Sequence, residues 1–310
     1  MRHVYSLAVL LALLPLTACG GGGSSSSPPS PPSPPPTPPP APIPTTNPPG
    51  ATTIPYGVAP QEFGDLRLPS TATFGAGPYP VAVIVHGGCW TSGVGTLVSS
   101  ASLADALTKR GVATWNIEYR AIGDPGGGFP GTFQDWSAAT DYVRTLAATY
   151  PLDLGRVIVV GHSAGGHAAL WLAARHKLAP TKELADPDPL PMLAAVDLDG
   201  PGELRPDLGY NRAMCNDAAD RLMGGTETTA PDHFAQASPS QLLPFGLPQT
   251  IVSATFVPLA AAQRYRDMAA ATGDSVTIID QTNSGHYEMI TPGTPQEVQV
   301  ETVVVNLLHP

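Results

Sequence analysis

The chain is poor in charged residues, in aromatic residues and in cysteine. Charged residues make up 13% of its 310 residues, aromatic residues make up 6%, and there are three cysteines. Lys and Arg number 15 against 25 Asp and Glu, a net charge of -10, which argues against binding to nucleic acid. Three cysteines are too few for a disulfide scaffold, and no apolar run reaches the roughly 20 residues of a membrane-spanning helix. One medium-sized domain remains, preceded by an unusual N-terminal segment.

Residues 1–18 have the pattern of a signal peptide. Arg2 supplies the positive start, and residues 4–16 form an apolar stretch too short for a stable membrane anchor. Residues 16–19 (LTAC) resemble a bacterial lipobox, in which Cys19 is acylated and becomes the mature N-terminus. An ordinary signal peptide in which Cys19 stands at the cleavage site by chance is the alternative. Gly20 follows instead of the Asp that retains such proteins at the inner membrane, so we expect a lipid anchor in the outer membrane of the cell envelope.

Residues 19–53 are predicted to be a tether. A Gly and Ser stretch at 20–27 is flexible, and the Pro-rich stretch at 28–49 is a semi-rigid spacer. Because residues 20–53 carry no charge and no hydrophobic periodicity, they cannot bury a core. We therefore predict a single domain over residues 54–310, a length that suits one α/β domain.

Within the domain, strand and helix patterns alternate along the chain. Continuous apolar runs at 81–85 and 157–160 are typical of parallel strands buried on both faces. Further strands are expected at 112–117, 193–198, 249–253 and 275–279, and helices at 99–110, 132–150, 164–175, 259–271 and from 294 onward. This alternation predicts a doubly wound, mostly parallel sheet of the α/β class. Residues 200–247 interrupt the alternation and are predicted to be a loop and helix excursion before the penultimate strand.

The sequence Gly161-His162-Ser163-Ala164-Gly165 matches the G-x-S-x-G pattern between a buried strand and a helix. Such a sharp turn projects the hydroxyl of Ser163 above the sheet, and it needs small neighbours, which the glycines and Ala164 provide. The N–H of Ala164 then lies at a helix N-terminus, where it can donate to a developing oxyanion. We therefore predict Ser163 as a nucleophile.

A second set of glycines follows the strand at 81–85. Gly87 and Gly88 let the backbone approach a substrate carbonyl, so their N–H groups can serve as oxyanion donors. A simple Gly-Gly turn is the alternative. We expect His86, directly before them, to hold this loop by hydrogen bonds.

A serine hydroxyl needs a base within hydrogen-bond reach. His286 follows Ser163 in the chain and lies in the loop directly after the last predicted strand, and it is our predicted base. His309 also follows that strand, but we expect it to be a solvated helix end. His162 and His167 lie in the serine turn and the helix after it, where we expect packing or capping. His233 lies in the excursion with no partner apparent from the sequence.

With these motifs (HGGCW at 86–90, GHSAGG at 161–166 and SGHYEMI at 284–290), residues 78–308 resemble the α/β-hydrolase superfamily. The resemblance is to esterases with an HGGxW loop and a GHSAGG turn, a group similar to feruloyl esterase-like, kynurenine formamidase-like and hormone-sensitive-lipase-like enzymes. It implies the fold and serine hydrolysis. It says little about the substrate.

The same resemblance implies an acidic residue after the strand at 249–253, and this chain has Ala254 there. Asp199, after the preceding strand, is a candidate substitute for the third member of a catalytic triad. A turn residue that bonds its own backbone is the alternative for Asp199. Asp280 and Glu288, which flank His286, are weaker candidates. A degenerate protein that only binds a ligand is the alternative to an active enzyme.

Two cysteines remain besides Cys19. In an oxidising compartment Cys89 and Cys215 could form a disulfide that joins the excursion to residues 86–90, the glycine loop. Alternatively, they could be two buried thiols. The sequence has no spacing of metal ligands and no nucleotide-binding loop, so we expect no cofactor. We predict a serine carboxylesterase that takes small-molecule esters, with an amidase, formamidase or peptidase of the same fold as the alternative.

Overall fold

The computed structural model describes residues 44–205 and 210–309; the predicted signal peptide, Cys19 and most of the predicted tether lie outside these ranges. The strands are β1 (Thr52–Pro55), β2 (Phe63–Arg67), β3 (Tyr79–Val85), β4 (Ala113–Ile117), β5 (Leu152–His162), β6 (Ala194–Leu198), β7 (Gln249–Ser253) and β8 (Val276–Asp280). The α-helices are α1 (Thr71–Phe74), α2 (Ala101–Lys109), α3 (Gly131–Asp141), α4 (Val143–Ala147), α5 (Ala164–Ala174), α6 (Ala218–Met223), α7 (Pro231–Ala237), α8 (Leu259–Thr272) and α9 (Pro295–Leu308). Short 3-10 helices span Leu97–Ser100, Arg175–Lys177, Arg212–Met214, Pro239–Leu242 and Glu288–Ile290.

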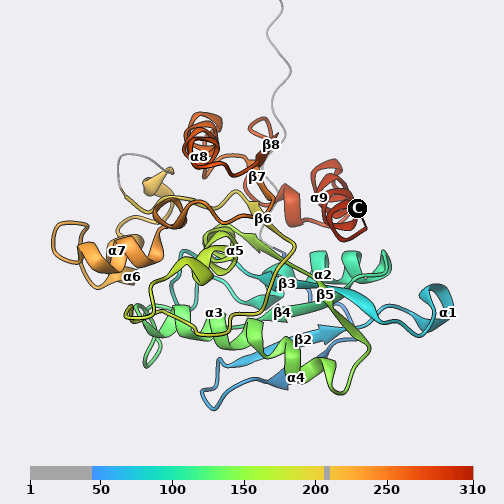
Figure 1. The fold of residues 1–310 in the computed structure, drawn as a ribbon. Coiled ribbons are helices and arrows are strands. Elements are labelled where there is room, and N and C mark those ends of the chain that lie inside the picture. Colours follow the sequence, from blue (N-terminus) through green and yellow to red (C-terminus); the bar gives the residue numbers. More distant parts are fainter. Residues whose placement is uncertain (1–43, 206–209, 310) are drawn as a thin grey trace, which may run out of the picture. The chain divides into compact units, whose positions relative to one another are not determined.

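One 8-stranded sheet, in the order β1-β2-β4-β3-β5-β6-β7-β8, organises the described residues (Figure 1). All pairs from β4 to β8 are parallel, whereas β1 pairs with β2, and β2 with β4, in the antiparallel sense. The predicted doubly wound, mostly parallel sheet is confirmed. The excursion also lies where we expected it, between β6 and the penultimate strand β7.

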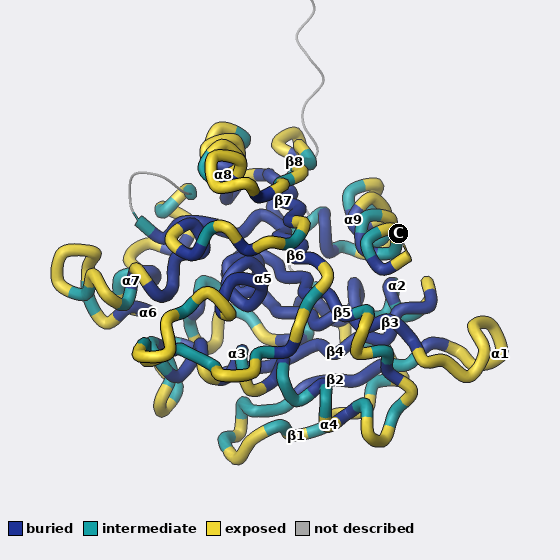
Figure 2. Tube along the Cα trace, in the orientation of Figure 1, coloured by how far each residue is buried: buried dark blue, intermediate teal, exposed yellow. Residues whose placement is uncertain are grey.

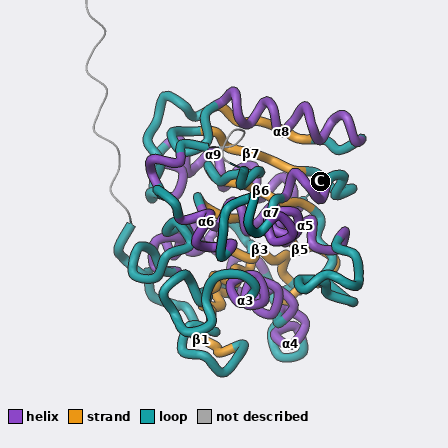
Figure 3. The backbone as a smooth tube through the Cα atoms, turned by 90° about the vertical axis from the view of Figure 1, so that its left-hand side faces the viewer, coloured by secondary structure: helices purple, strands orange, loops and turns teal. Residues whose placement is uncertain are grey.

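Alternate side chains of the central strands point to opposite faces of the sheet and build two hydrophobic cores. One core joins Ala82 and Ile84 of β3 to apolar side chains of α2 and α9. The other joins Val81, Val83 and Val85 to side chains of α3, α5 and α8. Figure 2 shows the buried central strands, and Figure 3 shows α3, α5, α6 and α7 together on one side. The serine turn is therefore supported from both faces.

The ordered part of the chain begins before the predicted boundary at residue 53. Strand β1 starts at Thr52, and the buried side chain of Arg67 donates to the Asn47 side-chain oxygen (2.7 Å) and to the carbonyl oxygens of Pro48 (2.8 Å) and Pro49 (3.0 Å). Asn47 also donates to Asp65 (3.1 Å). The prediction that the tether extends to residue 53 is therefore wrong. These contacts could not be predicted, because residues 47–49 carry neither charge nor an apolar pattern.

The N-terminus of α3 also differs from our expectation. We expected this helix to begin at residue 132, but it begins at Gly131, and no side chain caps it. The Thr132 hydroxyl donates to the Arg120 carbonyl oxygen (2.6 Å), and Asp135 accepts two bonds from the Arg120 side chain. A charged partner distant in the sequence thus replaces the local cap. The predicted start of α9 is confirmed: Thr294 caps it by accepting from the N–H of Glu297 (3.1 Å).

None of the helices formed by residues 44–205 and 210–309 is long and apolar enough to cross a bilayer.

Candidate active site

Ser163 lies in a strained turn between β5 and α5. Its backbone angles are φ 57° and ψ -119°, in the region of positive φ that residues other than glycine seldom adopt. The N–H of Ser163 donates to the carbonyl oxygen of Leu198 on β6 (2.8 Å), which fixes the turn to the sheet. A Cβ atom at Gly161 or Gly165 would collide with backbone atoms of Gly165 or Val85. The small neighbours are therefore required by the close approach of the backbone.

The imidazole of His286 is hydrogen-bonded to a buried carboxylate. His286 Nδ1 lies 2.6 Å from Asp199 Oδ2, and Asp199 is inaccessible to solvent. Asp199 also has a positive φ of 57°, at the end of β6. Because a carboxylate oxygen only accepts, Nδ1 carries the hydrogen, and Nε2 of a neutral ring is free to accept a proton.

The turn at 254–257, where the resemblance implies an acid, binds the carboxylate of Asp199 instead. Asp199 Oδ1 accepts from the N–H groups of Ala254 (2.9 Å) and Val257 (2.7 Å), and Oδ2 accepts from that of Phe256 (2.9 Å). Asp199 is thus not a turn residue that bonds its own backbone. Asp280 is instead on the surface, bonded to Thr282, and Glu288 begins a 3-10 helix.

The glycine loop passes directly over the serine. A Cβ atom at Gly87 would lie 2.9 Å from Ser163 Cβ, so only glycine fits there. Gly88 has a φ of 123°, a conformation that favours glycine. Ala164 is the first residue of α5, so its N–H has no partner within the helix.

His86 holds this loop, as we expected. Its ring bonds Glu118 through Nε2 (2.7 Å) and the Gly87 carbonyl oxygen through Nδ1 (2.6 Å), and it stacks on Tyr119 at 4.4 Å. Burial raises the pKa of Glu118, but His86 and the N–H groups of Leu97 and Tyr119 outweigh burial and lower it overall. Glu118 is therefore a charged partner for the loop.

Ser163, His286, Gly87 and Gly88 line one cavity of about 120 Å³. Asp199 lies behind His286. Sequence reasoning missed several other residues of the cavity wall: Val94, Gly95, Ser99, Met214, Phe256 and Tyr287. Of these, Tyr287 and Phe256 could have been suspected, since they adjoin the histidine and the turn of the expected acid.

Cys89 and Cys215 form a disulfide with their Cα atoms 5.4 Å apart. Both cysteines line the cavity, so the bridge is part of its wall and joins the glycine loop to the excursion. This is the first of the two possibilities left open by the sequence.

The histidines predicted to pack are buried. His167 accepts from Trp90 Nε1 (3.2 Å) and donates to the Ala237 carbonyl oxygen (2.8 Å), and burial lowers its pKa to about 4. His233 has the partner that the sequence did not indicate: its Nδ1 donates to the Met223 carbonyl oxygen (2.7 Å). Within the described ranges, no three His, Cys, Asp or Glu side chains are placed to hold a metal ion.

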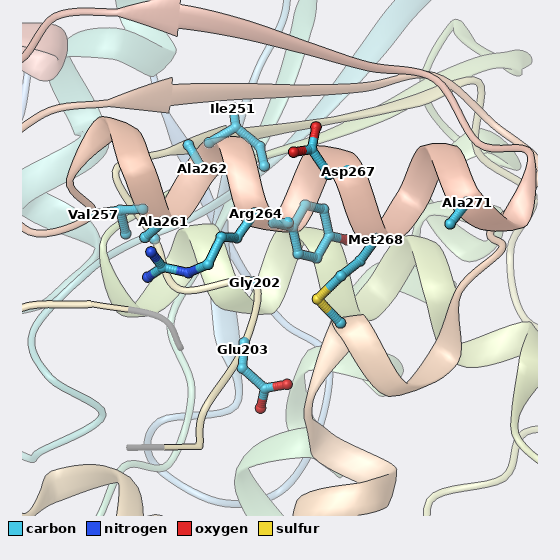
Figure 4. A pocket seen from close by; sticks show the side chains of 12 residues that line it. Gly202, Glu203, Ile251, Val257, Ala261, Ala262, Arg264, Asp267, Met268 and Ala271 are labelled. Carbon is cyan, nitrogen blue, oxygen red and sulfur yellow. The ribbon is translucent and has the colours of Figure 1, made fainter. Parts of the chain in front are cut away.

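A larger cavity, of about 390 Å³, has Val257 of the 254–257 turn in its wall (Figure 4). Its wall comes from α8, from β7 and from the start of the excursion, and includes Val257, Tyr265 and Met268. It contains neither Ser163 nor His286.

Solved structures of other proteins share this fold. A truncated form of a carbohydrate esterase from gut microbiota superposes with a TM-score of 0.70 over 87% of this chain and 99% of its own, at 21% identity. A bacterial heroin esterase superposes with a TM-score of 0.64 over 84% of each chain, at 22% identity. The fold is that of the α/β-hydrolases.

The family follows from the sequence comparison. The BD-FAE family model matches residues 65–254, more than half of the chain, and the protein belongs to this family of esterase-like α/β-hydrolases. A probable isoprenylcysteine alpha-carbonyl methylesterase of Arabidopsis thaliana is 33% identical over 117 residues, 38% of this chain. A protein of the same description from Oryza sativa subsp. japonica is equally similar. The match spans only 23% and 26% of these two relatives.

Proposed function

We propose that this protein is a serine carboxylesterase that acts through an acyl-serine intermediate. The observation that carries the proposal is the 2.6 Å hydrogen bond between His286 and Asp199, at a cavity that Ser163 and His286 both line. A catalytic triad needs a carboxylate that orients the base. Without one, a degenerate site that only binds a ligand would have been the better interpretation.

In the proposed reaction, Ser163 Oγ attacks the acyl carbon of the ester while His286 Nε2 takes the hydroxyl proton. Asp199 keeps the hydrogen on Nδ1 and stabilises the imidazolium. The tetrahedral oxyanion accepts from backbone N–H groups at Gly87, Gly88 and Ala164. His286 then returns the proton to the leaving alcohol, and in the second half it activates water to release the acid from Ser163.

The size of the cavity favours a short acyl group. At about 120 Å³ it is smaller than the cavity of about 150 Å³ that accommodates benzene in an engineered protein. The Cys89–Cys215 bridge and the buried ring of Phe256 form parts of the wall and bound the cavity there. We propose acyl groups of about two to four carbons.

The test uses full-length protein in detergent and its Ser163→Ala variant, with nitrophenyl esters of increasing chain length and a fluorophosphonate probe. We expect a burst of nitrophenol and covalent labelling that both vanish in the variant. Equal, negligible signals in the two proteins would favour the ligand-binding alternative. Turnover of anilides in preference to esters would favour an amidase.

The proposed location is the outer membrane of the cell envelope, with Cys19 as the lipid-bearing residue. The lipobox-like sequence and the uncharged stretch after it support this location. Mass spectrometry of the mature N-terminus tests it, because an unmodified Cys19 would contradict the anchor.

A further inference from the structure

A second histidine connects the serine to the base. His162 is the last residue of β5, directly before Ser163, and it is buried. Its Nε2 lies 2.8 Å from the backbone carbonyl oxygen of His286, and the two rings lie 4.5 Å apart between centroids. The carbonyl oxygen can only accept, so Nε2 of His162 donates the hydrogen bond.

His162 also contacts the glycine loop. A Cβ atom at Gly87 would lie 3.0 Å from His162 Nδ1, so the imidazole leaves no room there for a larger residue. A single side chain thus lies against the serine turn, the glycine loop and the loop of the predicted base.

The hydrogen bond of His162 persists while the base changes its charge. Burial lowers the pKa of His162 well below its usual value, and the charge of a protonated His286 lowers it further. These effects outweigh the opposing contribution of the bond to the His286 carbonyl. A neutral His162 with its hydrogen on Nε2 can therefore donate to the His286 carbonyl oxygen whether His286 is neutral or protonated.

We propose that His162 is a positioning residue: its bond fixes the main chain of His286, so that Nε2 of His286 is placed to accept the proton of Ser163. Asp199 holds the ring of His286 through Nδ1, and other bonds hold the main chain on either side, from the N–H of Ser284 to Gln281 and from the Thr291 hydroxyl to the Tyr287 carbonyl oxygen. The bond from His162 acts on the main chain of His286 itself, at its carbonyl oxygen. The inference rests on the proposed hydrolase function and adds a residue to it.

The test compares His162→Leu, which removes the donor, with His162→Gln, whose amide nitrogen can reach the same carbonyl oxygen. His233→Leu is the matched control, since it also removes a bond from a histidine to a backbone carbonyl, that of Met223, but away from Ser163. We expect His162→Leu to lower kcat about tenfold to a hundredfold with KM changed less than about threefold, because small misplacements of reacting groups have effects of that size. His162→Gln should recover most of kcat, and the control should match the parent.

Hydrogen–deuterium exchange of residues 281–290 gives a second readout that does not depend on activity. Loss of the bond should speed exchange in this segment about tenfold in His162→Leu and much less in His162→Gln. Equal kcat and exchange in His162→Leu and the parent would overturn the proposal, as would equal losses in the Leu and Gln variants. If the parent shows no Ser163-dependent turnover, the hydrolase function fails, and the exchange data still decide the role of His162.

Discussion

Asp199→Asn replaces one oxygen of the Asp199 carboxylate, which accepts four hydrogen bonds, with an NH2 group. If the new NH2 group takes the Oδ1 position, it faces the N–H groups of Ala254 and Val257, and both of their hydrogen bonds are lost because all three groups are donors. With the NH2 group at the Oδ2 position, it opposes only the N–H of Phe256, and it can donate to His286 Nδ1. The second orientation loses fewer bonds, so we expect the variant to adopt it.

That orientation moves the ring hydrogen of His286 to Nε2. Nε2, which takes the hydroxyl proton of Ser163 in the proposed reaction, can then no longer accept it. The corresponding change in serine proteases lowers kcat about ten-thousandfold, equivalent to about 5.5 kcal/mol of transition-state stabilisation. The opposed N–H of Phe256 should also lower the free energy of unfolding by about 1–3 kcal/mol.

The assay is the steady-state kcat for a short-chain nitrophenyl ester, with urea unfolding to verify that the variant is folded under assay conditions. Asp280→Asn is the matched control, because it changes another carboxylate near the histidine loop, one that bonds Thr282 on the surface and not His286. We expect its kcat to stay within about twofold of the parent, as for most exposed positions. Turnover of Asp199→Asn within tenfold of the parent would refute the assignment of Asp199 as the acid.

Two other predictions concern stability. Replacing both Cys89 and Cys215 with Ser opens a bridge between residues 126 positions apart, so the free energy of unfolding should fall by about 2–5 kcal/mol and kcat/KM should also decrease; an unchanged urea midpoint would contradict this. Burial, followed by the neighbouring Glu301, raises the pKa of Glu297 to about 7, although the hydrogen bond from the Gly293 N–H opposes this shift. The free energy of unfolding therefore falls as pH rises from about 4.3, the pKa of an unfolded Glu, to about 7. Glu297→Gln should therefore raise the free energy of unfolding by about 1–2 kcal/mol at pH 8 and leave it unchanged at pH 4.5. Equal effects at the two pH values would show that Glu297 does not titrate in this way.

The parallel strands and the helices between them could be predicted because burial on both faces leaves continuous apolar runs, as at 81–85 and 157–160. The antiparallel edge could not. Strand β1 is mostly exposed and β2 contains the buried charges of Asp65 and Arg67, so neither strand has an apolar pattern. The polar contacts that order residues 47–49 are likewise invisible in the sequence.

Ser163, His286 and the glycine loop were predicted from their place in the chain after particular strands. Asp199 stayed one of several candidates, because its selection depends on where the turn at 254–257 directs its N–H groups. The pairing of Cys89 with Cys215 depended in the same way on the path of the excursion. Sequence spacing carries no information about either.

The link between Ser163 and Leu198 has a geometric consequence for the predicted triad. Ser163 follows β5 and Asp199 follows the adjacent β6, and the N–H of Ser163 donates to the residue directly before Asp199. The main chains of two of the three predicted triad residues are therefore held next to each other by hydrogen bonding between adjacent strands, which lie about 4.8 Å apart in any sheet. His286 lies on a loop outside these two strands, so its place depends on the side-chain bonds that Asp199 and His162 make to it.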